Sequence, residues 1–396
     1  MKNFIKILPL AVVLTPSFSF AANYAIEARG DAMGGVGVVS ANFLTAPFYN
    51  PALVAIYRRN DDVGMIVPSF GISYNDEDHM VDDLDSISSF IEKKDYTNTE
   101  QLQKSLDNLQ NDKLKAEIGG VVAFAIPNQF IAANLFAKAY TETFVTPDIY
   151  SGENTASLTP ELQTVENAEL SAVNAVSVGV TEVGFSLAKY QTFLGQHIAF
   201  GVTPKLQRIY TYVYSASVTD YDIKDARDNG QGETMFNLDA GALWFYGPLR
   251  VGFSATNLVK RDIQTQSYTK SLKSQFGKTR DINIGYAYQM RPLYTVGVGI
   301  VADYATLSVD YDLNEEERYT NFNDNTQMIR VGGEIDIMRQ LKLRAGYKKN
   351  LAYDNVDGTI TAGVGISPLN LFQLDIGASY TNDNAMGAYI NFLASY

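Results

Sequence analysis

Apolar and polar residues alternate one by one through most of the second half of the chain, which is the period of a β-strand with two unlike faces. Between residues 307 and 313, leucine, valine and tyrosine at odd positions alternate with serine and aspartate at even positions. The same alternation runs through residues 236–246, 329–337, 341–347, 360–366 and 372–380. Each stretch is therefore predicted to be a strand with one apolar and one polar face.

Long and short connections alternate between the predicted strands. After a first strand at 63–74, the spacing of leucine and isoleucine over 82–115 predicts two short helices in a long loop. Pro127-Asn128 instead predicts a tight turn, and residues 143–170 predict a second long polar loop with a helix near 160–170. One rim with long loops and one rim with tight turns is typical of an outer-membrane β-barrel.

The number of strands depends on residues 281–302. Two strands turning at Arg291-Pro292 would give fifteen, an odd number that places the two ends of the chain on opposite sides. However, the apolar residues from Ile282 to Ile300 keep even numbers, and a two-residue hairpin would switch that parity. We therefore predict one long, bulged strand over 281–302, and an all-β, antiparallel transmembrane barrel of about fourteen strands.

The beginning of the chain predicts export. Residues 1–22 carry Lys2 and Lys6, then an apolar run over 7–14, then small residues ending at Ala22, which predicts a cleaved secretory signal peptide. No later stretch approaches the about 18 apolar residues of a spanning helix. The mature protein is therefore expected to cross a membrane with strands.

The end of the chain predicts an outer-membrane location. From Met386 to Tyr396 the residues alternate down to a terminal aromatic side chain, which is similar to the carboxyl-terminal signal of outer-membrane barrels. A soluble β-sandwich would alternate as well, but it would present its polar faces to water and needs neither a leader nor this ending. We therefore expect the outer membrane of a Gram-negative bacterium.

Residues 29–52 follow neither the period of a helix nor that of a strand. Their glycines allow backbone conformations closed to other residues, while Phe43, Phe48 and Tyr49 are too apolar for a solvated linker. Such a segment must be enclosed, so we predict that it plugs the barrel.

The sequence from Ala28 to Gly37, ARGDAMGGVG, followed by Asn50-Pro51-Ala52, resembles the amino-terminal hatch of the FadL-like outer-membrane transporters. It is most similar to the branch named after conjugal transfer protein TraF. The resemblance implies a hatch over 23–60 and a barrel over 61–396, and fourteen strands agree with it. It also implies passive transport of hydrophobic small molecules, with a non-transporting assembly component of a conjugal transfer or secretion apparatus as the alternative.

Candidate functional residues lie in the hatch and in the first long loop. Asn50, Pro51 and Ala52 are the hatch motif. Four large hatch residues are predicted to make plug contacts or to contact a ligand: Phe43, Leu44, Phe48 and Tyr49. In the loop, the helical stripe of Leu102, Leu106 and Leu109 is expected to pack on the barrel rim, and a partner surface is the alternative.

The inward faces of the last strands are strongly charged. They carry Asp310, Asp312, Arg330, Glu334, Asp336, Lys342, Arg344, Lys348 and Asp375. One interpretation is a polar path, or a dock for Glu27, Arg29 and Asp31 of the hatch. The other is a lattice of charges that pair between neighbouring strands and fill the lumen.

Composition excludes several functions. The chain has no cysteine, so disulfides, thiolate metal sites and thiol redox motifs are excluded. The net charge of −13 becomes −15 without the two leader lysines, which disfavours nucleic acid. His79 and His197 have no serine partner at a known spacing, and the acidic residues 76–83 lack the pattern of a calcium loop, so no enzyme activity, cofactor or metal is expected. The expected partners are outer-membrane lipid and lipopolysaccharide, the barrel-assembly machinery and a hydrophobic ligand.

Overall fold

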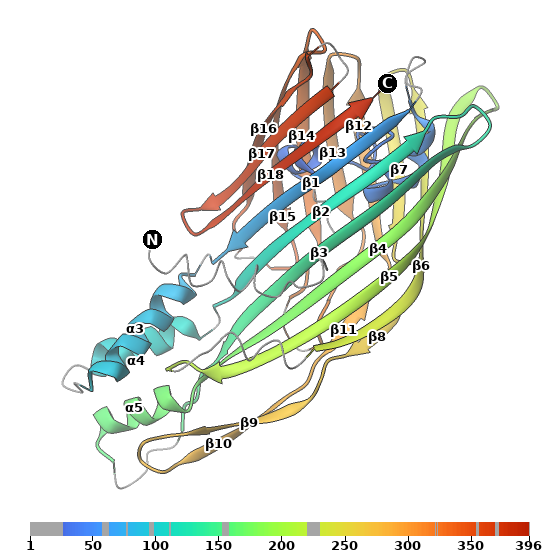
Figure 1. Cartoon of the computed structure of the whole chain (residues 1–396). Helices are drawn as coiled ribbons and strands as arrows, with labels where there is room; N and C mark the ends of the chain where they lie inside the picture. The colour runs from blue at the N-terminus through green and yellow to red at the C-terminus, as the bar shows by residue number, and fades with distance from the viewer. Residues whose placement is uncertain are drawn as a thin grey trace.

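Fourteen antiparallel strands close into one barrel (Figure 1). The computed structural model describes residues 27–57, 63–76, 78–94, 99–110, 112–152, 158–219, 230–320, 322, 324–353, 356–368 and 372–395. Around the barrel the strands follow the order β1–β18–β17–β16–β15–β14–β13–β12–β7–β6–β5–β4–β3–β2. Their bounds are β1 (Gly64–Asn75), β2 (Leu114–Ile126), β3 (Ala132–Asp148), β4 (Ala172–Phe193), β5 (Gln196–Ser217), β6 (Gly230–Tyr246), β7 (Leu249–Thr256), β12 (Leu293–Val301), β13 (Ala305–Asp312), β14 (Met328–Ile337), β15 (Leu341–Asn350), β16 (Thr359–Ile366), β17 (Phe372–Asn382) and β18 (Ala385–Ser395). The predicted fold and strand number are confirmed.

The alternation of the sequence separates the outside of the barrel from its lumen. Phe236 is 57% exposed and Ile376 is 53% exposed, whereas their neighbours Asn237 and Asp375 are fully buried. Apolar side chains thus cover the outer wall, and polar side chains point inward, the reverse of a water-soluble protein. Closure pairs the backbone groups of every barrel strand on both sides, as a lipid environment requires.

The prediction of one long strand over 281–302 is wrong. The chain there forms β10 (Thr279–Ile284), β11 (Ala287–Met290) and then β12, and of these only β12 lies in the barrel. β10 pairs with β9 (Tyr268–Lys273) and β11 pairs with β8 (Arg261–Gln264), so a bent hairpin extends beyond the rim (Figure 1).

The even numbering of the apolar residues could not reveal this extension. These residues are apolar both where they enter a protein core and where they face outward from the barrel. Ile282 and Met290 are buried in a protein core together with Val178 of β4 and Ile209 of β5, whereas Ile300 in β12 faces outward. Pro292 lacks the N–H that a continuous ladder needs, and the strand breaks there without turning back. Because the chain does not turn back at Pro292, this break adds no strand to the barrel, and the predicted number of fourteen barrel strands is correct.

The long-loop rim carries a helical cap made of α3 (Met80–Lys93), α4 (Thr99–Leu109) and α5 (Pro160–Glu169) (Figure 1). The stripe of Leu102, Leu106 and Leu109 is buried in a core shared with α3 and α5, so the expected packing is confirmed. The predicted loop over 143–170 is too long, because β3 stays paired with β4 as far as Asp148. None of the helices that the structure describes is long and apolar enough to span a membrane.

Two predictions fall outside the described residues. The leader, residues 1–22, lies before the first described residue, Glu27, and Tyr396 follows the last one.

The connection between α4 and β2 contains a buried carboxyl group. Asp112 is 6% exposed, and its Oδ2 atom has no hydrogen-bond partner among the described residues. Burial, followed by the negative charges of Asp78, Asp83 and Asp76, raises the pKa of Asp112 to about 7, while His79 opposes this effect. The folded cap therefore binds a proton more tightly than the unfolded chain, where an aspartate has a pKa of about 3.9.

We expect the stability of the cap to be highest below about pH 4 and to fall as the pH rises through about 7, because the buried carboxylate is then charged. Amide hydrogen-exchange protection in α4, corrected for intrinsic rates, should be higher at acidic than at alkaline pH. Asp112→Asn should remove most of this difference, and Asp107→Asn on the exposed face of α4 should keep it. Equal protection of the wild-type cap at both pH values would contradict this expectation.

Candidate functional site: the barrel lumen and its hatch

Residues 27–57, called the hatch segment below, form no strand and lie inside the barrel. They fold into α2 (Ala28–Ala32), η1 (Ala46–Phe48) and η2 (Pro51–Ala55). Helix α2 contacts β15 to β18 and β1, while η2 contacts β3 to β6, so the segment crosses the lumen from wall to wall. Figure 1 shows it in dark blue near β7 and β12, at the end away from the helical cap.

An ion-pair chain attaches the beginning of the hatch segment to the barrel. Arg29 donates from Nε and Nη2 to the two carboxylate oxygens of Glu334, at 3.1 and 3.0 Å. Arg344 binds the same carboxylate at 2.6 Å and binds Asp375 at 2.7 Å. All four side chains are largely shielded from water, so the loss of one partner would leave a buried charge without compensation.

Asp310 holds the next turn of the hatch segment. Its Oδ2 atom accepts hydrogen bonds from the backbone N–H groups of Gly37 and Val38, at 2.7 and 2.9 Å. The neighbouring charges Arg330 and Asp312 pair with each other at 2.8 Å. The inner wall therefore combines both predicted roles, a dock for the hatch and a lattice of paired charges.

The hatch motif is fully buried and touches the wall directly. Asn50 donates to the carbonyl oxygens of Val38 and Ala242, and its own Oδ1 accepts from Ala52 N at 3.0 Å. A Cβ atom added at Gly241 would lie 1.9 Å from Asn50 Oδ1. Pro51 begins η2, where its fixed φ fits and its missing N–H costs nothing. The motif is thus a docking element.

Glycines in the wall are partners that the sequence analysis did not single out. Gly332 and Gly346 face the hatch backbone, and a Cβ atom there would come within 1.9 Å of Met33 O and 2.2 Å of Gly34 N. Any side chain at these positions would displace the hatch segment. The signal was present in the sequence, because glycine occupies inward positions of neighbouring predicted strands.

The four large hatch residues lie in two places. Phe48 packs edge-on against Phe136 of β3 with ring centroids 5.2 Å apart, and Tyr49 donates from its hydroxyl to Glu27. Phe43 and Leu44 pack on the wall as well, but they also border a cavity. The structure therefore brings Phe43 and Leu44, and not Phe48 or Tyr49, to the edge of this open space.

Two cavities flank the hatch segment. The inner cavity, of about 310 Å³, lies toward the short turns, and the outer cavity, of about 450 Å³, lies toward the long loops. Along β15 the order is Lys342 in the inner cavity, Gly346 against the hatch, and Lys348 in the outer cavity. The hatch segment therefore separates the two cavities.

The outer cavity has aromatic and charged walls. The side chains of this kind that line it are Tyr74, Phe144, Phe322, Tyr353, Tyr389, Asp78, Lys113, Lys115, Glu117, Asp324, Lys348 and Asp357. Lys113 lies 4.4 Å from the ring centroid of Tyr353. Such a wall can contact an apolar molecule and still stay hydrated when no ligand is bound.

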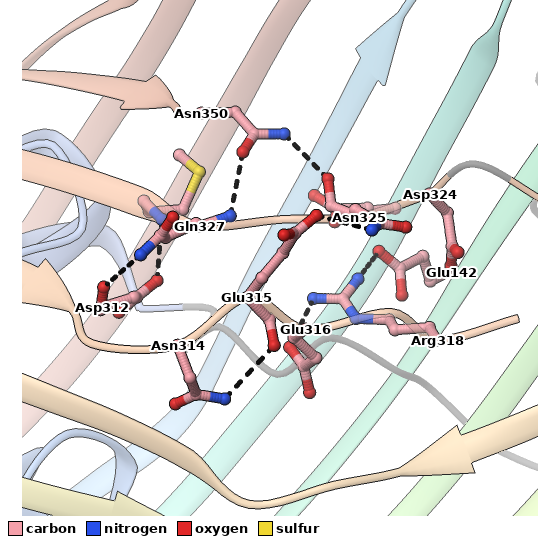
Figure 2. Close-up of polar contacts among 12 residues, drawn as sticks. Glu142, Asp312, Asn314, Glu315, Glu316, Arg318, Asp324, Asn325, Gln327 and Asn350 are labelled. Carbon is pink, nitrogen blue, oxygen red and sulfur yellow. Dashed lines mark hydrogen bonds and ion pairs between the residues drawn. The ribbon is translucent and has the colours of Figure 1, made fainter. Parts of the chain in front are cut away.

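A loop at the long-loop rim supplies part of the wall of this cavity, with Phe322, Asp324, Asn325 and Thr326. The described residues between β13 and β14 are 313–320, 322 and 324–327, and among them Arg318 and Tyr319 are fully buried. Figure 2 shows Arg318 between Glu142 of β3 and Glu316 of its own loop, with ion pairs to both. Sequence reasoning missed this loop because its charged residues look like those of a solvated connection.

These features define the class of the protein: a transmembrane barrel of fourteen strands with a segment docked in its lumen. A family model described as "F plasmid transfer operon, TraF, protein" matches residues 47–312, which is more than half of the chain. The chain therefore belongs to this TraF family. A search of curated proteins found no match.

Solved structures with the same fold are FadL-like outer-membrane barrels. The CymD monoaromatic hydrocarbon channel has a TM-score of 0.59 at 11% identity, covering 96% of this chain and 99% of that chain. The toluene transporter TbuX of Ralstonia pickettii gives 0.52 at 12% identity, with 93% and 97% covered. The toluene transporter TodX of Pseudomonas putida gives 0.50 at 11% identity, with 96% and 99% covered. At these identities the likeness confirms the fold predicted from the sequence.

We expect Arg29→Ala to loosen the hatch segment, because among the described residues Glu334 then keeps Arg344 as its one ion-pair partner. Removal of one member of a buried ion pair destabilises a protein by roughly 3–5 kcal/mol. Because Arg344 still binds Glu334, we expect a value near the lower figure. In planar bilayers the variant should show larger or more frequent conductance steps than the wild type. Arg339→Ala in the exposed turn after β14 is the matched control. Identical conductance of all three proteins would mean that Arg29 does not hold the lumen closed.

Proposed function

We propose that the protein is an outer-membrane channel for passive uptake of small hydrophobic molecules. The observation that carries the proposal is the hatch segment between an outer cavity of about 450 Å³ and an inner cavity of about 310 Å³. A molecule of moderate size fits into either cavity, and movement of one short segment would connect them. The fold that the chain shares with the hydrocarbon channel CymD and the toluene transporters also supports a role in the uptake of hydrophobic molecules.

The route begins at the aromatic wall of the outer cavity and ends at the hatch residues of the inner one. Transfer of an apolar molecule from water to such walls gains about 25 cal/mol for each square ångström of buried surface. Phe43 and Leu44 are the predicted ligand residues that border the inner cavity, so they are proposed to receive the molecule after it passes the hatch. Phe48 and Tyr49 are proposed to hold the hatch in shape.

The alternative, an assembly component recognised through the stripe of α4, lacks such support. Leu102, Leu106 and Leu109 are each at most 1% exposed and are covered by this chain itself. A partner would have to displace α3 or α5 to reach them.

Uptake of a labelled monoaromatic hydrocarbon by whole cells tests the proposal. A deletion strain should accumulate the compound more slowly than the same strain carrying the wild-type protein. The double variant Phe43→Ala/Leu44→Ala should bind the compound roughly tenfold more weakly, which corresponds to about 1.4 kcal/mol.

Phe48→Ala is the matched control for general loosening of the hatch, because Phe48 borders neither cavity described above. Surface amounts and heat-dependent gel mobility should be equal for all variants, since a closed barrel resists detergent until heated. Equal accumulation with and without the protein would overturn the transport function.

A further inference from the structure

The outside of β5 and β6 changes from apolar to polar at one level. Along β5 the outward residues Phe200 and Leu206 are exposed and apolar, and the next outward residue after Leu206 is Arg208. On the neighbouring strand β6, Phe236 pairs with Leu206 and Thr234 pairs with Arg208. An exposed arginine therefore lies directly beyond the apolar surface, on the side of the long loops.

The distance to the opposite boundary fits the thickness of a membrane. Near the short turns Ile198 of β5 pairs with Trp244 of β6, and Trp244 donates from Nε1 to Gln196 at 2.9 Å. From this pair to the pair of Arg208 and Thr234 each strand advances by ten residues. At about 3.3 Å per residue and a tilt of about 40°, that advance rises about 25 Å, the height of the apolar band of an outer-membrane barrel. Arg208 thus lies at the level of the headgroups of the outer leaflet.

Neighbouring side chains hold the guanidinium of Arg208 on the wall without neutralising it. Its Cζ atom lies 4.7 Å from the ring centroid of Tyr210, and its Nη1 atom donates to Thr234 Oγ1 at 3.2 Å. Both partners are uncharged, and among the described residues Arg208 forms no ion pair. The guanidinium carries more N–H donors than these contacts use, so it can also bind an anion.

A second cation lies on the other side of β6. Val259 N donates to Asn237 Oδ1 at 2.9 Å, and Arg261 pairs with Glu233, so the segment after β7 runs along β6. Lys260 lies between these two attachments. It is exposed and forms no ion pair with the residues that the structure describes.

The acidic side chains described in this segment and beside it are already paired. Glu233 binds Arg261, and Asp262 binds Arg291 at 2.5 Å. Arg208 and Lys260 therefore leave a local positive charge, although the whole chain carries −13. Exposed cations at headgroup level attract anionic lipid headgroups.

We propose that Arg208, Thr234 and Lys260 bind a phosphoryl group of lipopolysaccharide. The lipid A part of that molecule carries phosphoryl groups over several acyl chains, which matches a cationic edge above an apolar wall. Arg208 and Lys260 supply charge-assisted hydrogen bonds, and the acyl chains lie on Leu206 and Phe236, which are 56% and 57% exposed. The site lies outside the barrel, so it is independent of the lumen and of the proposed transport function.

Two lipids that differ only in their phosphoryl groups test the site. Lipid A and a dephosphorylated lipid A with the same acyl chains are titrated into the full-length protein in detergent, and native mass spectrometry measures the bound fraction. Lipid A should bind more tightly. Arg208→Gln should weaken lipid A roughly fivefold and leave the dephosphorylated lipid unchanged, because only charge-assisted bonds are lost. Lys260→Gln should weaken lipid A by a smaller factor.

Two further variants control for indirect effects. Lys189 is exposed on β4 and pairs with Phe200 near the opposite boundary of the same wall, so Lys189→Gln should bind lipid A like the wild type. Arg208→Lys keeps the charge but loses the planar fork, so its affinity should lie between those of the wild type and Arg208→Gln. It also replaces Arg208→Gln if that variant fails the heat-dependent mobility test.

The comparison of lipids decides the assignment. Equal affinity of the wild type and Arg208→Gln for lipid A, or equal loss of both lipids, would overturn the proposal. Phosphatidylglycerol should bind more weakly than lipid A, because it has fewer acyl chains and one phosphoryl group. If it binds as tightly and with the same dependence on Arg208, the assignment to lipopolysaccharide is wrong. None of these measurements involves uptake, so failure of the transport function would not change their outcome.

Discussion

The hydrogen-bonded seam between β1 and β18 is the interaction on which the rest of the molecule depends. It joins the first barrel strand to the last, over pairs from Gly64 with Ser395 to Asn75 with Ala385. Without it, two strands would present unpaired N–H and C=O groups to lipid, where each costs several kcal/mol. Pro68, which lacks an N–H, lies where the register of β1 shifts toward both neighbours, so a bulge keeps the seam continuous there.

Closure creates an interior that cannot be filled by apolar side chains alone, because the apolar face is needed outside. The polar faces therefore meet in the lumen, and their charges must compensate one another. Lys205, for example, pairs with Asp239 at 2.8 Å and with Glu182 at 3.6 Å. Charge compensation also holds the hatch segment in place. Its guanidinium, Arg29, binds Glu334, and its N–H groups of Gly37 and Val38 bind Asp310.

Features that depend on neighbouring residues could be predicted from the sequence, and features that depend on distant residues could not. The two faces of a strand follow from a period of two, so the inward position of Asp310 and Asp375 was predictable. The choice of partner was not, because Asp310 binds hatch N–H groups while Asp312 beside it binds an arginine. The apolar run of β10 and β11 looked like a membrane strand because a protein core and a lipid bilayer both favour isoleucine and methionine.

The long separation of the docking partners has a consequence for the order of folding. Arg29 and Glu334 are 305 positions apart, and Ala28 and Asn391 are 363 apart. Contacts of such high contact order carry the full entropic cost of loop closure and form late. The hatch segment, which is synthesised before every barrel strand, is therefore among the last parts of the chain to reach its final place. Until the last strands are in position it has no wall to bind, so a slowly assembling barrel would leave its amino-terminal portion open to periplasmic proteases and chaperones.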